Sequence, residues 1–239
     1  ITNRNVELII STKEAFIITS LSWVLLSILC AVPFVYTQSS LSVVDSLFES
    51  MSGITTTGAT ILNNLDELPK GILIWRALLQ WLGGIGIVVI ALVILPFLRI
   101  GGMQLFHLEG DDPYEKFLPK ISSVVSKIIY VYVSLTLLLI ILYYLNGMIL
   151  FDAIAHSFTT ISTGGFSTHN ESFAYFQSNS ILNIAIIFMI IGSIPFLLLA
   201  QTTVTNIFNV IKDHQVRLFL IILFISITII YYFARNYID

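Results

Sequence analysis

Long apolar runs alternate with short polar segments along this chain. A helix rises about 1.5 Å per residue, so about 20 apolar residues cross the roughly 30 Å hydrocarbon core of a bilayer. Runs of this kind, with nearly uncharged interiors, cover residues 15–36, 72–98, 124–145, 181–200 and 218–233. The pattern therefore predicts an all-α membrane protein with about five transmembrane helices.

Two basic residues interrupt these runs. Arg76 and Lys127 each lie within a turn or two of the end of a predicted span. A long basic side chain at such a position can extend to the lipid headgroups. We therefore expect both residues to act as interfacial anchors.

The composition supports the membrane assignment. Hydrophobic residues make up 56% of the chain and charged residues only 10%, whereas soluble domains carry about 25% charged residues. The mean hydropathy is +0.93. A net charge of −3 gives no indication of nucleic-acid binding. Cys30 is the only cysteine, so no disulfide is expected within the chain.

Basic residues also predict the orientation, because they concentrate in short cytoplasmic loops. With alternating spans, the N-terminus and the segments 99–123 and 204–216 carry most of the Lys and Arg residues. We expect these parts to face the cytoplasm. The segments 37–71 and 146–180 should then face outward.

Each outward-facing segment opens with an apolar run that is too short to cross a bilayer. The runs cover residues 41–54 and 149–161, and a helix of 14 residues reaches only about 21 Å. Both runs are interpreted as re-entrant half-helices, which enter the membrane and return on the same side.

A short tract of Thr, Ser and Gly follows each half-helix, at residues 55–60 and 162–167. The two copies align without gaps at a constant spacing of 107 residues, from Asp45 to Asp152 and from Gly58 to Gly165. This self-similarity indicates a repeated unit made of a span, a pore half-helix, a filter loop and a second span.

Irregular backbone at membrane depth survives only where protein or water satisfies its polar groups. A Thr/Gly tract at that depth should line an aqueous path, and its carbonyls can replace the hydration shell of a monovalent cation. Neither tract contains a carboxylate, which disfavours a divalent-cation site. One copy alone could equally be an extracellular turn, but two copies in register favour a pore. The candidate ion-binding residues are Thr55, Thr56, Thr57, Gly58, Ser162, Thr163, Gly164 and Gly165.

Four further polar residues lie on the half-helices at equivalent positions. Glu49 and His156 are expected to form structural hydrogen bonds behind the tracts, with tuning of the electric field at the pore mouth as the alternative. Asp45 and Asp152 lie near the starts of the half-helices, where an acidic side chain caps exposed backbone N–H groups.

The predicted organisation comprises two complete units and the start of a third. The first unit covers residues 1–98 and the second covers 124–203, with a cytoplasmic loop at 99–123 between them. Residues 204–239 form a second cytoplasmic loop and the first span of a third unit.

The sequence resembles the Trk/Ktr/HKT superfamily of potassium transporters, and specifically its TrkH branch. The resemblance covers nearly the whole chain. It is carried by SLFESMSGITTTGAT (46–60), WRALLQWLGGIGIVV (75–89), GGMQLF (101–106) and AHSFTTISTGGFS (155–167). The run Gly83-Gly84-Ile85-Gly86 could suggest a nucleotide loop, but it lies within an apolar span, so close helix packing is the better interpretation.

The resemblance implies a pore of four units in the plasma membrane of a bacterium, each unit donating one filter strand with a key glycine. Gly58 and Gly165 take that place here, and Gly58 favours potassium over sodium because relatives with serine there tend toward sodium. The family also implies a homodimer and a cytosolic nucleotide-binding subunit that gates it. Potassium is then the transported ligand, and no cofactor is expected.

Two units supply half a filter, so the remaining pore units lie on another polypeptide, were lost, or belong to a longer transporter of which this chain is a fragment. Two other functions stay open: a non-conducting or regulatory membrane subunit, and a broken-helix secondary transporter for another small solute. No enzyme activity is expected. The polar cluster of His107, Glu109, Asp111 and Asp112 lacks zinc-site spacing and is interpreted as a solvated loop.

Overall fold

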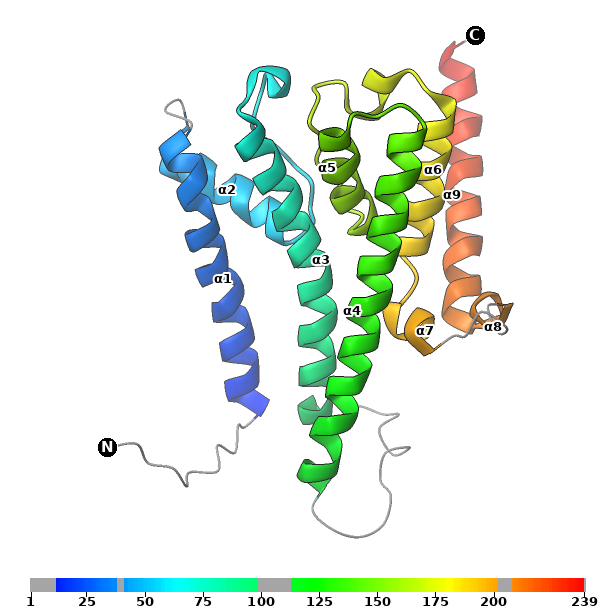
Figure 1. The fold of residues 1–239 in the computed structure, drawn as a ribbon. Helices are drawn as coiled ribbons and strands as arrows, with labels where there is room; N and C mark the ends of the chain where they lie inside the picture. Colours follow the sequence, from blue (N-terminus) through cyan, green and yellow to red (C-terminus); the bar gives the residue numbers. More distant parts are fainter. Residues whose placement is uncertain (1–11, 38–40, 99–112, 202–207, 239) are drawn as a thin grey trace. The chain divides into compact units, whose positions relative to one another are not determined.

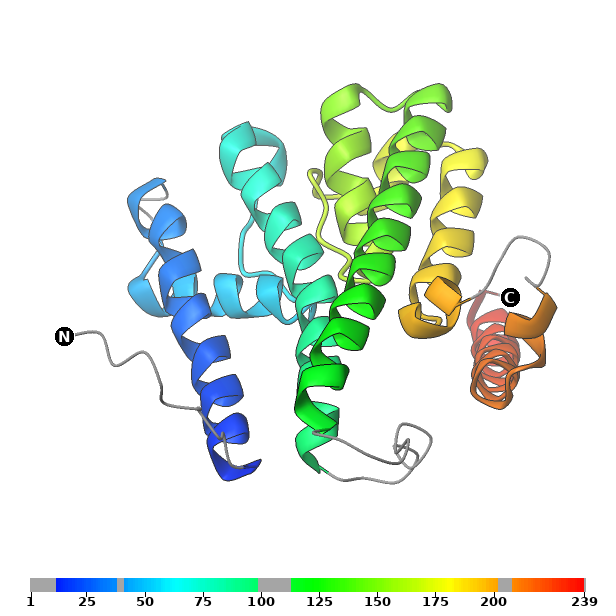
Figure 2. The ribbon, with the colours of Figure 1, turned by 60° about the horizontal axis from the view of Figure 1, so that its bottom comes forward.

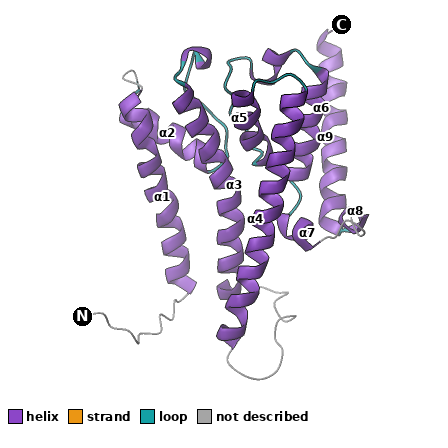
Figure 3. Ribbon diagram, in the orientation of Figure 1, coloured by secondary structure: helices purple, strands orange, loops and turns teal. Residues whose placement is uncertain are grey.

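In a computed structural model of the protein, residues 12–37, 41–98, 113–201 and 208–238 are described. These residues form helices and connecting loops, and contain no strand (Figure 3). The predicted all-α class is therefore confirmed. The chain divides into two compact units, Ile1–Ser193 and Ile194–Asp239, which are taken separately below.

Four of the described helices are long and apolar enough to cross a membrane. Each includes most of one predicted span, because an uncharged run of this length favours an uninterrupted helix in lipid. The helices are α1 (Thr12–Thr37), α3 (Lys70–Leu98), α4 (Pro113–Leu145) and α9 (His214–Ile238).

The predicted continuous helix over residues 181–200 is wrong. Helix α6 (Asn179–Gly192) has only 14 residues, and a separate helix α7 (Phe196–Gln201) follows it. Pro195 explains the break, because proline lacks a backbone N–H and disfavours helical geometry at the residue before it. The second compact unit contains α7, α8 (Phe208–Lys212) and α9.

Two short helices lie in the segments that were predicted to face outward, both within the compact unit Ile1–Ser193. Helix α2 (Val43–Ile54) and helix α5 (Leu150–Ile161) have 12 residues each. Helix α2 lies between α1 and α3, and α5 packs against α3, α4 and α6 (Figures 1 and 2). The order of long helix, short helix, loop and long helix therefore occurs twice, with α6 as the shorter final helix of the second copy.

Helix α3 joins the two repeats. It contacts α2 of its own repeat and α5 of the next one. A buried apolar cluster where α1 meets α3 and the loop before it contains Phe34, Leu62, Leu65, Ile72, Leu73 and Leu79. Removing such side chains from lipid or water and packing them closely fixes the position of α3.

Glycines allow the last helix of each repeat to approach the end of the half-helix. A Cβ at Gly83 would lie 1.8 Å from the carbonyl oxygen of Ile54, and a Cβ at Gly192 would lie 2.6 Å from that of Ile161. Ile54 and Ile161 are equivalent in the repeat. The close packing predicted for this glycine run is therefore present at Gly83, whereas a Cβ at Gly86 would meet no atom within 4 Å.

This difference generates a prediction with an internal control. Gly83→Ala should lower the free energy of unfolding by about 1–3 kcal/mol, because the added methyl forces α3 away from the backbone of α2. Gly86→Ala should be neutral or stabilising by up to about 1 kcal/mol, because alanine favours the helix. Thermal unfolding of both variants in detergent micelles measures the difference, and equal thermal midpoints would contradict the packing described here.

Candidate ion-binding site

The first half-helix ends in a Schellman motif, a helix terminus closed by a left-handed residue. The N–H of Thr57 donates to the carbonyl of Ser52 at 2.9 Å, and that of Thr56 donates to the carbonyl of Gly53 at 3.0 Å. Thr56 is the left-handed residue, with φ +56°. This position usually holds glycine, because a side chain there is strained.

The second half-helix ends in the same way. The N–H of Gly164 donates to the carbonyl of Thr159 at 2.8 Å, and that of Thr163 donates to the carbonyl of Thr160 at 3.0 Å. Thr163 has φ +55°. Two equivalent threonines therefore adopt the same unfavourable conformation, which costs about 1–3 kcal/mol each and is typical of functional sites.

Two equivalent glycines continue the path of the chain after these threonines. Gly58 has φ +79° and Gly165 has φ +82°. Residues other than glycine are strained at such angles. The two tracts thus follow the same backbone course, which the sequence repeat predicted only at the level of residue type.

Most backbone carbonyls in the two tracts lack a hydrogen-bond donor. Among the described residues, none donates to the carbonyl oxygens of Thr55, Thr56, Thr57, Gly58, Ser162, Thr163 or Gly165. The exception is Gly164, whose carbonyl accepts a hydrogen bond from Nε2 of Gln80 at 2.9 Å. A backbone carbonyl without a protein partner needs water or a cation. The tracts can therefore supply oxygen ligands to an ion.

One later carbonyl in each tract is anchored by a side chain. The Ser52 hydroxyl donates to the carbonyl of Ala59 at 2.6 Å, and Arg76 Nη1 donates to that of Ser167 at 3.0 Å. The tracts also touch each other: a Cβ at Gly58 would lie 2.0 Å from the carbonyl oxygen of Gly164. Glycine at position 58 is therefore required by contact as well as by conformation.

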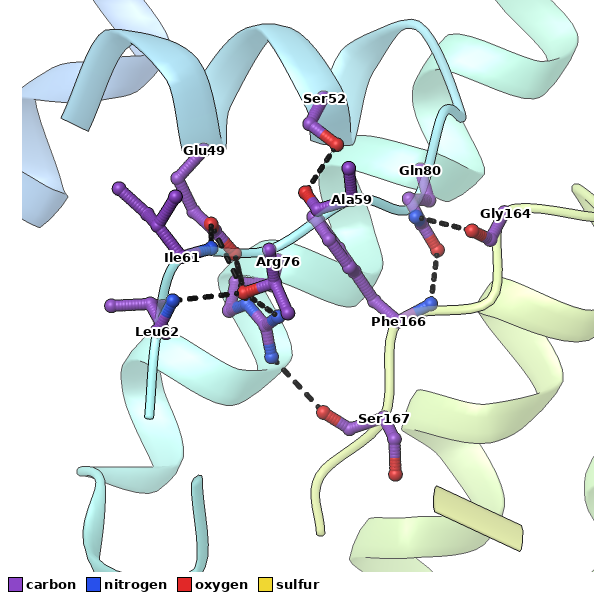
Figure 4. A network of polar contacts seen from close by, with 11 residues as sticks. Glu49, Ser52, Ala59, Ile61, Leu62, Arg76, Gln80, Gly164, Phe166 and Ser167 are labelled. Carbon is purple, nitrogen blue, oxygen red and sulfur yellow. Dashed lines mark hydrogen bonds and ion pairs between the residues drawn. The ribbon is translucent and has the colours of Figure 1, made fainter. Parts of the chain in front are cut away.

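A buried ion pair lies behind the first tract (Figure 4). Arg76 Nε donates to Glu49 Oε1 at 2.8 Å, and the two side chains are 1% and 0% exposed. Glu49 also accepts hydrogen bonds from the Thr60 hydroxyl at 2.9 Å and from the Ile61 N–H at 3.2 Å. The carboxylate thereby ties α2 to the end of the tract and to the loop that follows it.

Arg76 extends this network to the second repeat. Besides its bond to the Ser167 carbonyl, its Nη2 donates to the Thr60 hydroxyl at 3.0 Å. Its guanidinium lies 4.2 Å from the centre of the Phe166 ring, within the range of a cation–π interaction. The expectation that Arg76 is an interfacial anchor is therefore wrong, because its side chain is buried and paired inside the protein. Its partners lie on other segments, which its position along α3 does not reveal.

The second repeat has a corresponding arrangement with a histidine in place of the glutamate. His156 is 1% exposed, and its Nε2 lies 3.1 Å from the Ser167 hydroxyl. This pair is equivalent to Glu49 and Thr60. The expected structural hydrogen bonding of Glu49 and His156 is therefore confirmed.

The two equivalent aspartates have different roles. Asp45 forms a capping box with Ser42, as expected: its N–H donates to the Ser42 hydroxyl, and the Ser42 N–H donates to its carboxylate, both at 3.1 Å. Asp152 does not cap α5. It accepts a hydrogen bond from the Thr168 hydroxyl at 2.8 Å instead, because the chain leaving the second tract passes close to it.

The outer loops of the two repeats are also joined. Asp66 accepts hydrogen bonds from the His169 ring and, at 2.8 Å, from Asn170 Nδ2. The His169 hydrogen bond lowers the pKa of Asp66 from its ordinary 3.8. Stability from this contact is present above that ordinary value and is lost as the pH falls through the lowered one.

The sequence interpretation did not single out Gln80, Asp66 or His169. Gln80 could have been found, because an uncharged polar side chain inside an apolar span is itself unusual. The cluster His107, Glu109, Asp111 and Asp112 lies outside the described residues. Within the described part of the chain, no three His, Cys, Asp or Glu side chains are placed to hold a metal ion.

Comparison with known proteins gives consistent matches. The profile of the TrkH family, described as "Cation transport protein", matches residues 2–237. The Trk system potassium uptake protein TrkI of Halomonas elongata is 40% identical over 215 residues, which cover 90% of this chain and 44% of that protein. TrkH of Vibrio parahaemolyticus is 45% identical over 192 residues, covering 79% of this chain and 40% of that protein.

A solved structure is also similar. The crystal structure of the potassium transporter TrkH from Vibrio parahaemolyticus matches with a TM-score of 0.68 and 42% identity, and the match covers 79% of this chain and 38% of the crystallised one. The chain spans less than half the length of the curated relatives described above.

The buried ion pair generates a prediction about stability. Arg76→Met should destabilise the protein by about 3–5 kcal/mol, because it leaves the Glu49 carboxylate buried without its partner. Glu49→Gln leaves Arg76 unpaired and should be destabilising too. The double variant should lose less than the sum of the two, because neither charge then remains. Thermal unfolding in detergent measures the coupling, and additive losses would show that the pair does not act as a unit.

Proposed function

Because the chain belongs to the TrkH family of cation transport proteins, we propose that it contributes two of the four filter strands of a Trk-type transporter for potassium uptake. The transporter acts in the plasma membrane, the inner membrane if the source is a bacterium. The four long apolar helices among the described residues provide the membrane-spanning scaffold.

The observation that carries this proposal is the set of unpaired carbonyls in two equivalent tracts. In seven of the eight candidate residues, the carbonyl oxygen accepts no hydrogen bond from any described residue. A ring of carbonyl oxygens can replace the hydration shell of a potassium ion. Two tracts supply half of such a ring, and two further units complete it.

Electrostatics at the tracts favours a cation. The C-terminal ends of α2 and α5, which carry partial negative charge, run directly into the tracts. Neither tract contains an acidic side chain, and the nearby Glu49 is neutralised by Arg76. The site therefore offers dipoles without net negative charge, which suits a monovalent ion better than a divalent one.

The proposed ion ligands are the carbonyls of Thr55, Thr56, Thr57, Gly58, Ser162, Thr163, Gly164 and Gly165, with Gly164 shared with Gln80. The proposed pore units run over residues 1–98 and 124–203, and residues 204–239 begin a third. Family resemblance supports a homodimer and a cytosolic nucleotide-binding regulatory subunit as partners. No cofactor and no enzymatic step are proposed.

A growth assay tests this function. We define the completed transporter as this chain joined in frame to the part of the Vibrio parahaemolyticus relative that follows the aligned region. Expressed in a bacterial strain that lacks potassium uptake, it should restore growth at low potassium and take up rubidium. Absence of uptake by the completed transporter, once it is present in the membrane, would reject the proposed function.

Substitution of the key glycines locates the filter. Gly58→Val and Gly165→Val should each reduce rubidium uptake by about tenfold or more, because a side chain at positive φ costs about 1–3 kcal/mol and moves the carbonyls. Gly71→Val is the control, because a Cβ there would meet no atom within 4 Å. Normal uptake by both filter variants would show that these tracts do not conduct the ion.

A further inference from the structure

Gln80 contacts the second tract from the first repeat. It lies on α3, one helical turn after Arg76, and its side chain is completely buried. Residues four apart lie on the same face of a helix. The face of α3 that carries Arg76 and Gln80 therefore reaches across to the tract of the neighbouring repeat (Figure 4).

Both ends of the Gln80 amide are used. Its Nε2 donates to the Gly164 carbonyl at 2.9 Å, and its Oε1 accepts from the Phe166 N–H at 3.1 Å. The two bonds flank Gly165, the residue that has φ +82° and a carbonyl without a donor among the described residues. The side chain thus acts as a clamp on the two peptide groups that border this glycine.

The clamp fits closely. A Cβ at Gly164 would lie 2.3 Å from Gln80 Oε1 and 2.7 Å from Nε2. The Gly164 carbonyl also lies against Gly58, where a Cβ would approach it to 2.0 Å. Gln80 and Gly58 together leave the Gly164 peptide little freedom to move, which fixes the distance between the two tracts.

The second repeat differs at the corresponding position. Gly192 on α6 contacts Ile161 as Gly83 on α3 contacts Ile54, so the residue three positions before each glycine is equivalent. These residues are Gln80 on α3 and Met189 on α6. A methionine thioether cannot donate a hydrogen bond to a carbonyl. The clamp is therefore present where α3 meets the second tract, and the equivalent position on α6 cannot form it. It is not a general requirement of the fold.

We propose that Gln80 is a specificity-determining positioning residue, whose amide clamp on Gly164 and Phe166 sets the position of the Gly165 carbonyl and so the discrimination between potassium and sodium. This inference rests on the proposed function of the same site. Potassium is larger than sodium, so oxygens held apart by a rigid clamp suit potassium, whereas a tract that can close inward also coordinates sodium.

The test uses substitutions of similar size in the completed transporter. Gln80→Met removes both hydrogen bonds, and Gln80→Glu keeps an acceptor for the Phe166 N–H but places an oxygen against the Gly164 carbonyl. Thr136→Val is the matched control. Thr136 is a buried side chain that accepts a hydrogen bond from Trp81 Nε1 at 3.1 Å, and none of its hydrogen bonds involves either tract.

The main readout is the ratio of rubidium uptake to sodium uptake. Gln80→Met should lower this ratio roughly tenfold. A change of this size is expected when the buried hydrogen bonds of one side chain are lost. Gln80→Glu should lower it as well. Thr136→Val should reduce thermal stability while it leaves the ratio unchanged. A second readout is hydrogen exchange of the peptide that contains Phe166, which should become faster in Gln80→Met but not in Thr136→Val.

Each outcome decides the question. Unchanged selectivity in a Gln80 variant that reaches the membrane would overturn the inference while the proposed function stands. If Gln80→Met does not reach the membrane, the selectivity of Gln80→Glu decides. An equal loss of selectivity in Thr136→Val would also overturn it, because general loosening would then be the cause. Failure of the unsubstituted completed transporter to take up rubidium would reject the proposed function itself.

Discussion

The arrangement of the two tracts depends on the buried ion pair between Glu49 and Arg76. Moving two charges out of water is costly, and the cost is recovered only where hydrogen bonds satisfy the remaining donors and acceptors. Here Thr60, Ile61 and Ser167 supply these bonds. These groups also lie in the segments at the ends of both tracts, so correct burial of the charges requires correct placement of the tract backbone.

The strained conformation of Thr56 and Thr163 has its explanation in this surrounding structure. A left-handed threonine persists only where neighbouring contacts fix the backbone on both sides. Before each threonine, a glycine on the following helix packs against the last carbonyl of the half-helix. After it, side chains hold the rest of the tract by its carbonyls. The tight packing of α3 and α6 therefore supplies the free energy that keeps carbonyls oriented without donors.

The sequence predicted the helical class, the two half-helices and the repeated tracts, because these follow from local periodicity and from self-comparison of the chain. It did not predict the bond from Arg76 to the Ser167 carbonyl or the clamp by Gln80, since both reach segments more than 80 residues away. The sequence also predicted one span that continued through Pro195, because hydropathy reflects side-chain polarity and not the loss of a backbone N–H donor. The predicted capping role of Asp152 was wrong for a related reason. Asp152 and Asp45 occupy equivalent positions on their helices, but the loop that contains Thr168 lies beside Asp152 and binds its carboxylate.

Helix α3 carries the side chains that hold the second tract, while it belongs to the first repeat. The two repeats are thus complementary rather than autonomous modules. Exchange of one repeat for that of a relative would pair this α3 with a tract from another protein, or this tract with another helix, although each module would remain internally intact. The contact between the repeats therefore depends on a fit between side chains of one repeat and the backbone of the other.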